Sequence, residues 1–285
     1  MPSLRNEVIS AAAHLTTGPH TERARQDAET LLLHVLGENK AWLMAHADET
    51  LPSDQGRSYI ELVERRYHGE PIQYIVGETE FYGLPFSVAP DVLIPRPETE
   101  HLVEKSLELA THFPASNPQI RILDVGTGSG AIAVALARNL PQATITAIDL
   151  SAKALTIAGK NAARNAVMIR FLEGDLLAPV AGERFEIIVS NPPYVPVADR
   201  ATLSVEVRDH EPALALFAGD DGLEVYRQLI PEAYEALIHG GYIALEIGYG
   251  QLPAITELLS NCGFEKVEFV ADLQGIPRVV SARRS

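Results

Sequence analysis

The sequence predicts an α/β fold with a doubly wound parallel sheet, preceded by a small helical bundle. From about residue 119 onward, short apolar runs alternate with longer amphipathic segments. This alternation is typical of strands and helices that follow one another in a parallel sheet. The first 70 residues contain only helix-like patterns, so this part should form a separate bundle with its own core.

Two helices define the expected bundle. Thr21 is a candidate N-cap for a segment with apolar residues at helical spacing, which Gly37 would end. A second segment of the same kind begins at Ser53 or Asp54 and stops near Gly69. Both segments have an apolar face, so they should pack against each other.

Residues 71–95 have a different character, with short aromatic stretches punctuated by glycines. They predict a β-hairpin that links the bundle to a larger domain. The prolines of Ile94-Pro95-Arg96-Pro97 then force an extended stretch, after which Pro97 or Thr99 opens a helix. The expected domains are 1–70 for the bundle, 71–95 for the hairpin linker and 96–285 for the α/β domain.

The α/β domain should alternate strands and helices. The expected strands are Ile120–Val125, Ala143–Ile148, Val167–Leu172, Phe185–Ser190, Tyr242–Ile247, Lys266–Val270 and Arg278–Ser281. The expected helices are Gly130–Asn139, Ser151–Asn165, Leu223–Ile238 and Gln251–Leu259. Ligands of such sheets bind at the carboxyl ends of the strands, so the residues that follow each strand are candidates for a functional site.

Composition and charge exclude several classes of protein. The chain has 285 residues, 46% of them apolar and 21% charged, and no apolar run approaches the roughly 18 residues of a membrane span. Cys262 is the only cysteine, and no histidine has a metal-ligand spacing to it or to another histidine. We therefore expect no disulfide, no metal site, no membrane partner and, because a signal pattern is also missing, a cytoplasmic protein. The net charge of −15, with acidic excess on both sides of residue 88, opposes a nucleic-acid partner.

The motif Asn191-Pro192-Pro193-Tyr194 directly follows the strand expected at 185–190. Two consecutive prolines end the ladder of hydrogen bonds and fix φ, so a rigid loop must follow. The Asn191 side-chain oxygen and the Pro192 carbonyl can each accept one hydrogen of a planar –NH₂ group, and Tyr194 can pack on its face. The alternative is a simple strand terminator with an edge tyrosine, and the other motifs weigh against it.

A glycine turn joins the strand at 120–125 to the next helix, in the run Asp124-Val125-Gly126-Thr127-Gly128-Ser129-Gly130. Glycines let the backbone approach a ligand, and a helix N-terminus offers free N–H groups. Asp149, followed by Leu150, ends the next strand, where a carboxylate can bind ribose hydroxyls. Asp175 and Leu176 follow the third strand, where they can meet an adenine amino group and ring face.

Two cofactors fit the glycine turn. Gly126, Gly128 and Ala131 also satisfy the pattern of dinucleotide-binding proteins, so NAD is a competitor at this point. Hydride transfer has no evident use for the two acceptors at Asn191 and Pro192, whereas methyl transfer to an –NH₂ group that they hold has one. The four motifs together therefore favour S-adenosylmethionine.

In this order, the four motifs resemble those of class I S-adenosylmethionine-dependent methyltransferases, and the Asn191 loop is similar to that of the branch that methylates amino groups. Further stretches resemble the release-factor glutamine methyltransferase family (PrmC/HemK). These are Pro71–Gly77 with Phe81-Tyr82-Gly83, Leu93–Glu100, and Glu211–Leu216 with Gly219 and Asp221–Leu223. The resemblance spans nearly the whole chain. One departure is Leu176, where the family often has an aromatic residue.

The resemblance implies a Rossmann-like, seven-stranded sheet with an antiparallel last strand. It implies S-adenosylmethionine as cofactor, S-adenosylhomocysteine as product, and the glutamine of the Gly-Gly-Gln tip of class I peptide-chain release factors as substrate, which the N-terminal bundle helps to recognise. A monomer is expected. The implied catalytic and substrate residues are Asn191, Pro192, Pro193 and Tyr194, with Phe81 and Arg96 at the substrate side. Pro97, Glu98 and Thr99 are expected to wall the pocket beside them. The implied cofactor residues are Asp124, Gly126, Thr127, Gly128, Ser129, Gly130, Asp149, Leu150, Asp175, Leu176 and Asn191.

Three other functions compete with this one. A nucleic-acid amino-methyltransferase of the adenine-N6 type shares the Asn191 chemistry, but the −15 charge opposes it. A non-catalytic cofactor-binding assembly factor would not need an intact Asn191-Pro192-Pro193-Tyr194 loop. A dinucleotide-dependent dehydrogenase is the remaining alternative, which adding NAD or S-adenosylmethionine in a thermal-shift assay would separate from the others.

Overall fold

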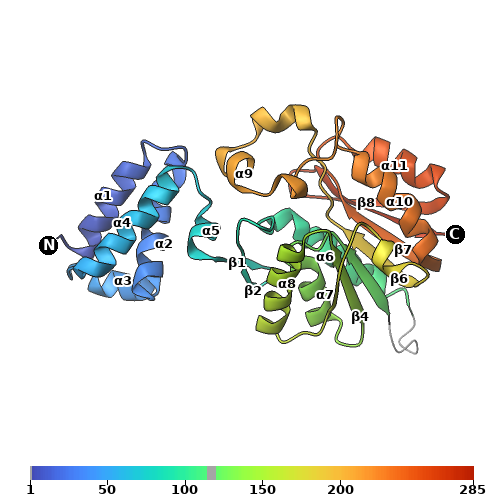
Figure 1. Cartoon of the computed structure of the whole chain (residues 1–285), viewed down its shortest axis with the longest axis horizontal. Helices are drawn as coiled ribbons and strands as arrows, with labels where there is room; N and C mark the ends of the chain where they lie inside the picture. The colour runs from blue at the N-terminus through green and yellow to red at the C-terminus, as the bar shows by residue number, and fades with distance from the viewer. Residues whose placement is uncertain (1, 114–119) are drawn as a thin grey trace. The chain divides into compact units, whose positions relative to one another are not determined.

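The computed structural model describes residues 2–113 and 120–285 (Figure 1). The chain divides into two compact units. The first unit comprises the chain up to Gly77 together with Leu203–His210, and the second comprises Glu78–Thr202 and Glu211–Ser285. Among the described residues, no helix is long and apolar enough to cross a membrane.

The first unit is helical, as the sequence predicts. Its α-helices are α1 (Leu4–Leu15), α2 (Ala24–Leu36), α3 (Lys40–His46), α4 (Ser53–Tyr67), α5 (Ile72–Val76) and α9 (Val205–His210), and a 3₁₀ turn at Thr21–Arg23 precedes α2. Helix α2 ends at Gly37, which has a φ of 70° that favours glycine. Leu31 and Leu32 of α2 and Tyr59 of α4 are fully buried in the shared core.

Helix α5 corrects the prediction for residues 71–77, which the sequence placed in the hairpin. Ile72 and Ile75 are both buried in the core of the first unit, and their spacing of three residues suits a helical turn. Gly77, with a φ of 80°, then ends the helix. The hairpin itself consists of β1 (Glu78–Phe81) and β2 (Leu84–Ser87) and belongs to the second unit.

A buried arginine connects three helices of the first unit. Arg66 of α4 is only 1% exposed, and its Nε donates to Asp27 Oδ2 of α2 over 2.7 Å. The same guanidinium donates to the Glu70 carbonyl and to Glu206 of α9. A charge without contact to water is tolerated only when it is paired and hydrogen-bonded in this way.

We expect Asp27→Asn to lower the free energy of unfolding of the first unit by about 1–3 kcal/mol, because the buried guanidinium loses a charged partner. Trp42, the only tryptophan, lies in α3, so its fluorescence in a urea titration reports on this unit. The control is Asp48→Asn, which breaks an exposed ion pair with Arg5. Equal losses in the two variants would contradict the assignment.

The second unit is built on a seven-stranded sheet in the order β5-β4-β3-β6-β7-β9-β8. Its strands are β3 (Arg121–Val125), β4 (Thr144–Asp149), β5 (Arg170–Glu173), β6 (Phe185–Ser190), β7 (Leu237–Glu246), β8 (Phe264–Ala271) and β9 (Pro277–Arg284). Strands β3 to β7 are parallel, and β9 runs antiparallel to both β7 and β8. This confirms the predicted sheet and its antiparallel last strand.

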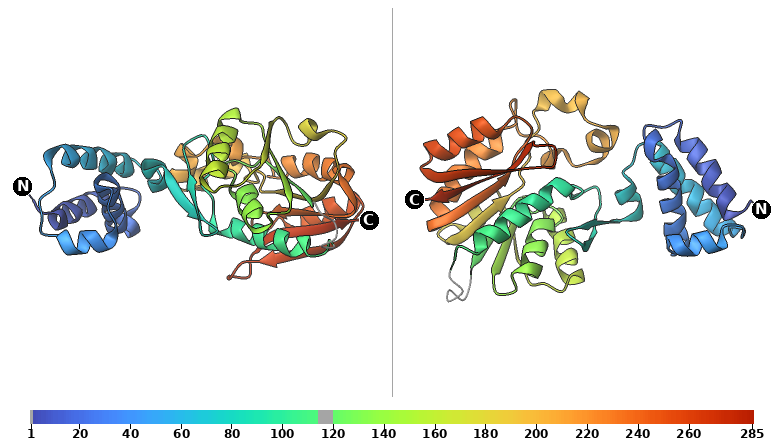
Figure 2. Two further views of the ribbon diagram at one scale, coloured as in Figure 1. Left: turned by 90° about the horizontal axis from the view of Figure 1, so that it is seen from below. Right: turned by 180° about the vertical axis from the view of Figure 1, so that it is seen from behind.

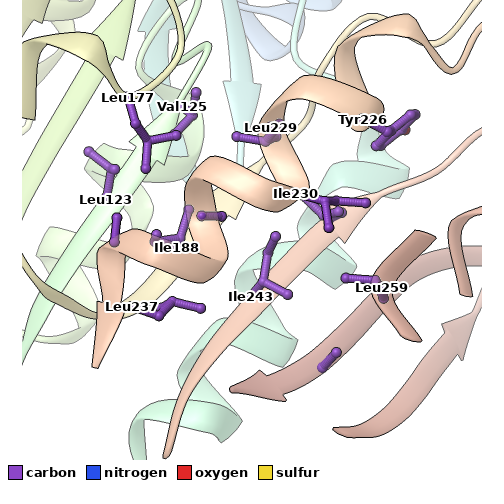
Figure 3. Close-up of a cluster of buried hydrophobic side chains, with 14 of the residues drawn as sticks. Leu123, Val125, Leu177, Ile188, Tyr226, Leu229, Ile230, Leu237, Ile243 and Leu259 are labelled. Carbon is purple, nitrogen blue, oxygen red and sulfur yellow. The ribbon is translucent and has the colours of Figure 1, made fainter. Parts of the chain in front are cut away.

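Helices cover both faces of this sheet (Figure 2). They are α6 (Glu100–Ala110), α7 (Ala131–Asn139), α8 (Ala152–Arg164), α10 (Glu224–Ala236) and α11 (Leu252–Asn261). On one face, Leu229 and Ile230 of α10 pack over Leu123, Ile188 and Ile243 of the central strands (Figure 3). On the other face, the neighbouring strand residues pack against α6 and α7, because successive side chains of a strand alternate between faces.

The boundary between α10 and β7 differs from the prediction. The sequence predicts a helix to Ile238 and a strand from Tyr242, but α10 ends at Ala236 and β7 begins at Leu237. Leu237 is fully buried in the core beneath α10 and pairs with Phe185. The pairing then shifts register before Tyr242, where Gly240 adopts a φ of 79°.

Strand order places the functional edge of the sheet. From β3 the chain moves outward through β4 and β5, and it then returns to the other side of β3 for β6 and β7. The carboxyl ends of β3 and β6 therefore flank a topological switch point, where doubly wound sheets bind their ligands.

Candidate active site

A cavity of about 340 Å³ opens at the carboxyl ends of β3, β4, β5 and β6. Its volume lies in the range of small-molecule and cofactor sites, roughly 300–1,000 Å³. Most of the predicted site residues line it, from four different strand ends and the segment before α6. They are Arg96, Gly126, Thr127, Gly128, Ser129, Asp149, Leu150, Asp175, Leu176, Asn191, Pro192 and Pro193.

Four predicted residues lie outside this lining. Asp124 is fully buried behind the glycine turn, and Gly130 forms the N-cap of α7. Tyr194 is half-buried and packs against the core below the Asn191 loop. Phe81 is 1% exposed and packs in the core with Phe86, so the structure does not bring it to the cavity.

The glycine turn adopts backbone angles that need glycine. Gly126, Gly128 and Gly130 have φ values of 73°, 56° and 81°. A Cβ on Gly130 would lie 3.0 Å from the Cβ of Ala158 in α8, so this glycine also permits the close approach of two helices. The turn is therefore shaped by its sequence and not by a ligand.

Asp124 presents a buried carboxyl oxygen without a partner. Its Oδ2 accepts a hydrogen bond from Thr127 Oγ1 over 2.6 Å, whereas Oδ1 has no hydrogen-bond partner among the described residues. Burial raises the pKa of Asp124 to about 7, and the nearby Asp149 adds to this, against the opposing effect of Thr127. A buried carboxyl oxygen that no described side chain binds is suited to a cationic group such as an α-ammonium.

Asp149 holds the glycine turn and faces the cavity. Its Oδ2 accepts from the Gly128 N–H over 2.7 Å, and its Oδ1 accepts from the Ser151 N–H over 2.9 Å. Burial raises the pKa of Asp149, while these two hydrogen bonds lower it. Each carboxylate oxygen keeps a further lone pair, which suits a pair of ribose hydroxyls.

The Asn191 loop leaves β6 beside the glycine turn. Ser190 Oγ donates to the Val125 carbonyl over 2.6 Å and so ties the end of β6 to the end of β3. Asn191 Nδ2 donates to Thr99 Oγ1 over 3.1 Å. The two prolines supply carbonyl acceptors without competing N–H donors, so acceptors are concentrated at this point of the cavity wall.

Gln251 fixes the far end of this loop, a role that the sequence did not reveal. Its Nε2 donates to the carbonyls of Tyr194 and Gly222, over 3.0 and 3.2 Å, and its Oε1 accepts from the Gly248 N–H. Burial raises the pKa of Tyr194 to about 12, so the ring stays neutral. Because Gln251 is the N-cap of α11, 57 positions after Tyr194, the sequence around the Asn191 motif gives no sign of this contact.

Two further acidic residues border the site. Arg96 forms an ion pair with the buried Glu211, and not with Glu98 or Glu100 as its surroundings in sequence would suggest. Glu246, 3% exposed, ends β7 next to the Asn191 loop. The rule that strand ends carry functional residues would have found Glu246, because it lies within the predicted strand 242–247 at the same edge.

The fold and this site define a class of protein, the Rossmann-like S-adenosylmethionine-dependent methyltransferases. The family model of the Methyltransferase small domain matches residues 102–207, and that of the PrmC N-terminal domain matches residues 7–77. The chain is 43% identical to the release factor glutamine methyltransferase of Koribacter versatilis over 283 residues, which is 99% of each chain. It is 44% identical over 285 residues to that of Deinococcus radiodurans, again covering 99% of each. The chain belongs to the release factor glutamine methyltransferase family.

Solved structures agree on the fold. A methyltransferase from Pyrococcus furiosus has a TM-score of 0.51 and 19% identity, covering 72% of this chain and 91% of that one. The hMettl16 catalytic domain, solved with an RNA hairpin, has a TM-score of 0.58 and 17% identity, covering 82% of each chain. At these identities the likeness concerns the Rossmann-like architecture only.

Proposed function

We propose that this protein methylates the side-chain amide nitrogen (N5) of the glutamine in the Gly-Gly-Gln tip of class I peptide-chain release factors. The observation that supports this most directly is that Asn191 and Pro192 both line the cavity beside the glycine turn, where the Asn191 Oδ1 and the Pro192 carbonyl are available as acceptors. Two fixed acceptors next to a cofactor pocket match the two hydrogens of a carboxamide –NH₂ group. The high identity to relatives of this name supports the same substrate.

Chain residues would hold the cofactor along the strand ends. Asp124 would face the ammonium of the methionine part, the turn Gly126–Gly130 would seat that part, and Asp149 would accept the ribose hydroxyls. Asp175 would meet the adenine amino group and Leu176 would cover its ring. When bound, S-adenosylmethionine supplies an electrophilic methyl group on a sulfonium.

The substrate amide needs alignment more than a strong base. An amide nitrogen is a weak nucleophile because its lone pair is delocalised into the carbonyl. Asn191 Oδ1 and the Pro192 carbonyl would each accept one hydrogen, which raises the electron density on nitrogen and aims it into the pocket. The protons on the substrate nitrogen become acidic only after this nitrogen has been methylated, so no strong base is needed before the attack. Arg96 would border the substrate, whereas Tyr194, which lies outside the cavity lining and packs against the core, would have to turn toward the cavity to pack on the amide plane.

We further propose that the first unit, to which residues 1–70 contribute most of the helices, recognises the release factor, and that the second unit transfers the methyl group. A cytoplasmic monomer that binds no nucleic acid fits the single cysteine and the net charge of −15. The main alternative is methylation of an exocyclic amino group in a nucleic acid, because the same two acceptors would serve it.

Labelled S-adenosylmethionine separates these possibilities. The protein is incubated with a class I release factor, with a variant of that factor in which the Gly-Gly-Gln glutamine is alanine, and with duplex DNA. We expect label on the wild-type factor only. Label on DNA, or equal label on both factors, would contradict the proposed substrate.

We expect Gly222→Ala to lower kcat by about 10–100-fold, because a small displacement of an aligned reactant has effects of this size. Gly222 has a φ of 72°, and a Cβ there would lie 2.2 Å from the Tyr194 carbonyl oxygen, so the Asn191 loop must move. The control is Gly250→Ala, which has a similar φ of 78° but open space around it. Initial rates and melting temperatures are compared. Equal rates in both variants would show that backbone strain, and not loop position, matters.

A further inference from the structure

Three side chains meet where β6, β7 and the turn before α6 come together. The pairing of Ser190 with Leu245 puts the next residues, Asn191 and Glu246, at adjacent strand ends. Thr99, in the 3₁₀ turn Pro97–Thr99, is 4% exposed, and its Oγ1 accepts from Asn191 Nδ2 over 3.1 Å. Glu246 is 3% exposed, and its Oε2 has no hydrogen-bond partner among the described residues.

We propose that Glu246 and Thr99 are positioning residues that set the orientation of the Asn191 amide. They occupy its –NH₂ side, so that Oδ1 is turned to the substrate. This inference rests on the proposed function, in which Oδ1 accepts a hydrogen from the substrate amide. An amide rotated by 180° would present Nδ2 instead, and two –NH₂ groups would then face each other without an acceptor.

The charge of Glu246 explains why one orientation is enforced. An ionised carboxylate only accepts hydrogen bonds, so the groups that bind it must be donors. Burial raises the pKa of Glu246, and hydrogen bonds from Thr99 and Asn191 oppose this rise. The Thr99 hydroxyl can thus donate a hydrogen bond to Glu246 while its oxygen accepts one from Asn191 Nδ2. A protonated Glu246 could donate to Asn191 Oδ1 and would no longer exclude the rotated amide.

A purely structural role would predict a cationic partner for this glutamate. Glu186 in β6, which is 5% exposed, has one in Arg121, at 3.1 Å. No ion pair joins Glu246 to any residue in the described ranges 2–113 and 120–285. Arg278, whose charge lowers the pKa of Glu246, is itself paired with Asp272 at 2.9 Å. The buried carboxylate is therefore left to the amide and the hydroxyl.

The kinetic test compares Glu246→Gln and Thr99→Val with two matched controls. Both variants should lower kcat at saturating cofactor by about 10–100-fold, which is less than the roughly 10²–10³-fold expected for removing a polar group at the reacting centre itself, because both residues act through Asn191. Thr99→Ser keeps the hydroxyl and Glu186→Gln neutralises a buried glutamate elsewhere, so both should stay within about threefold of wild type. Cofactor dissociation constants should stay within the same limit. Wild-type kcat in both Glu246→Gln and Thr99→Val would overturn the proposal.

The pH profile adds a readout that a structural role would not move. The pKa of Glu246 is raised to about 7 by burial and by Glu98, and lowered by Thr99, Arg278 and Asn191; the buried hydroxyl of Tyr194 also lies within its electrostatic influence. Because the carboxylate is the orienting form, kcat should fall as the pH drops through this value. The rates are measured at saturating S-adenosylmethionine, so that the titration of Asp124 does not alter them through cofactor binding. If kcat of Glu246→Gln fell at low pH in the same way as that of the wild type, the proposal would be contradicted.

An independent measurement uses the protein without cofactor or substrate. The side-chain ¹⁵N–¹H₂ signals of Asn191, assigned by comparison with Asn191→Ala, should show slow hydrogen exchange and shift with pH near 7 in wild type. Glu246→Gln should abolish the pH-dependent shift, whereas Glu186→Gln should preserve it. If the wild type showed this behaviour but transferred no methyl group to a release factor, the proposed function would fail and the orienting role would stand. Signals unaffected by Glu246→Gln would refute that role whatever the substrate.

Discussion

Asn191→Ala should lower kcat by about 10²–10³-fold, the range found when one fixed polar group is removed from a reacting centre. The variant removes the acceptor for one amide hydrogen, and it leaves the Pro192 carbonyl as the only fixed acceptor that we assign to the substrate. Nothing in the glycine turn contacts the Asn191 amide through a hydrogen bond that the structure describes, so cofactor binding should persist. The effect should therefore appear in kcat and not in the cofactor dissociation constant.

Two measurements check this result. Single-turnover transfer of labelled methyl to a release factor gives the rate, and calorimetry with S-adenosylhomocysteine gives the affinity. Asn139→Ala is the control, because Asn139 is an exposed asparagine at the end of α7 that bonds only the Ala135 carbonyl of its own helix. Near-wild-type turnover in Asn191→Ala would contradict the mechanism in which Asn191 Oδ1 accepts a hydrogen of the substrate amide. Loss of cofactor affinity would show that Asn191 acts on the cofactor instead.

The site residues at the strand ends could be predicted from the sequence because the pattern that marks them is local. Asp149 and Asn191 each follow a short apolar run, and parallel strands bring such positions to one edge of a sheet. This logic needs no knowledge of distant contacts. It therefore predicted the glycine turn, Asp149 and the Asn191 loop at one edge of the sheet, and the structure brings them together at one cavity.

The long-range contacts that position the Asn191 loop escaped the same reasoning, which placed Thr99 at the pocket wall but not against Asn191. Thr99 bonds Asn191 across 92 positions, and Gln251 bonds Tyr194 across 57. Neither separation corresponds to a periodic pattern that can be recognised in the sequence. Phe81 shows the opposite failure, because an aromatic residue in a glycine-rich hairpin suits a pocket wall or a core equally well, and here it packs in the core. Burial in the first unit likewise made residues 72–76 a helix where local composition indicated a strand.

Asp149→Ala should raise the dissociation constant of S-adenosylmethionine by about 30–150-fold, which corresponds to about 2–3 kcal/mol, the upper range for hydrogen bonds to a charged group. Two effects combine in this variant. The ribose hydroxyls lose their carboxylate acceptor, and the Gly128 and Ser151 N–H groups lose the partner that holds the turn in shape. Asp149→Asn keeps one acceptor oxygen, so its loss should be smaller.

Calorimetric titration of the three proteins with S-adenosylhomocysteine measures these differences without a release factor. Asp91→Ala is the matched control, because Asp91 lines the same cavity but is exposed and paired with Lys153. Its dissociation constant should stay close to wild type. An unchanged constant in Asp149→Ala would refute the ribose role. Equal losses in Asp149→Ala and Asp91→Ala would mean that the general negative charge of the cavity, and not a directed hydrogen bond at the end of β4, retains the cofactor.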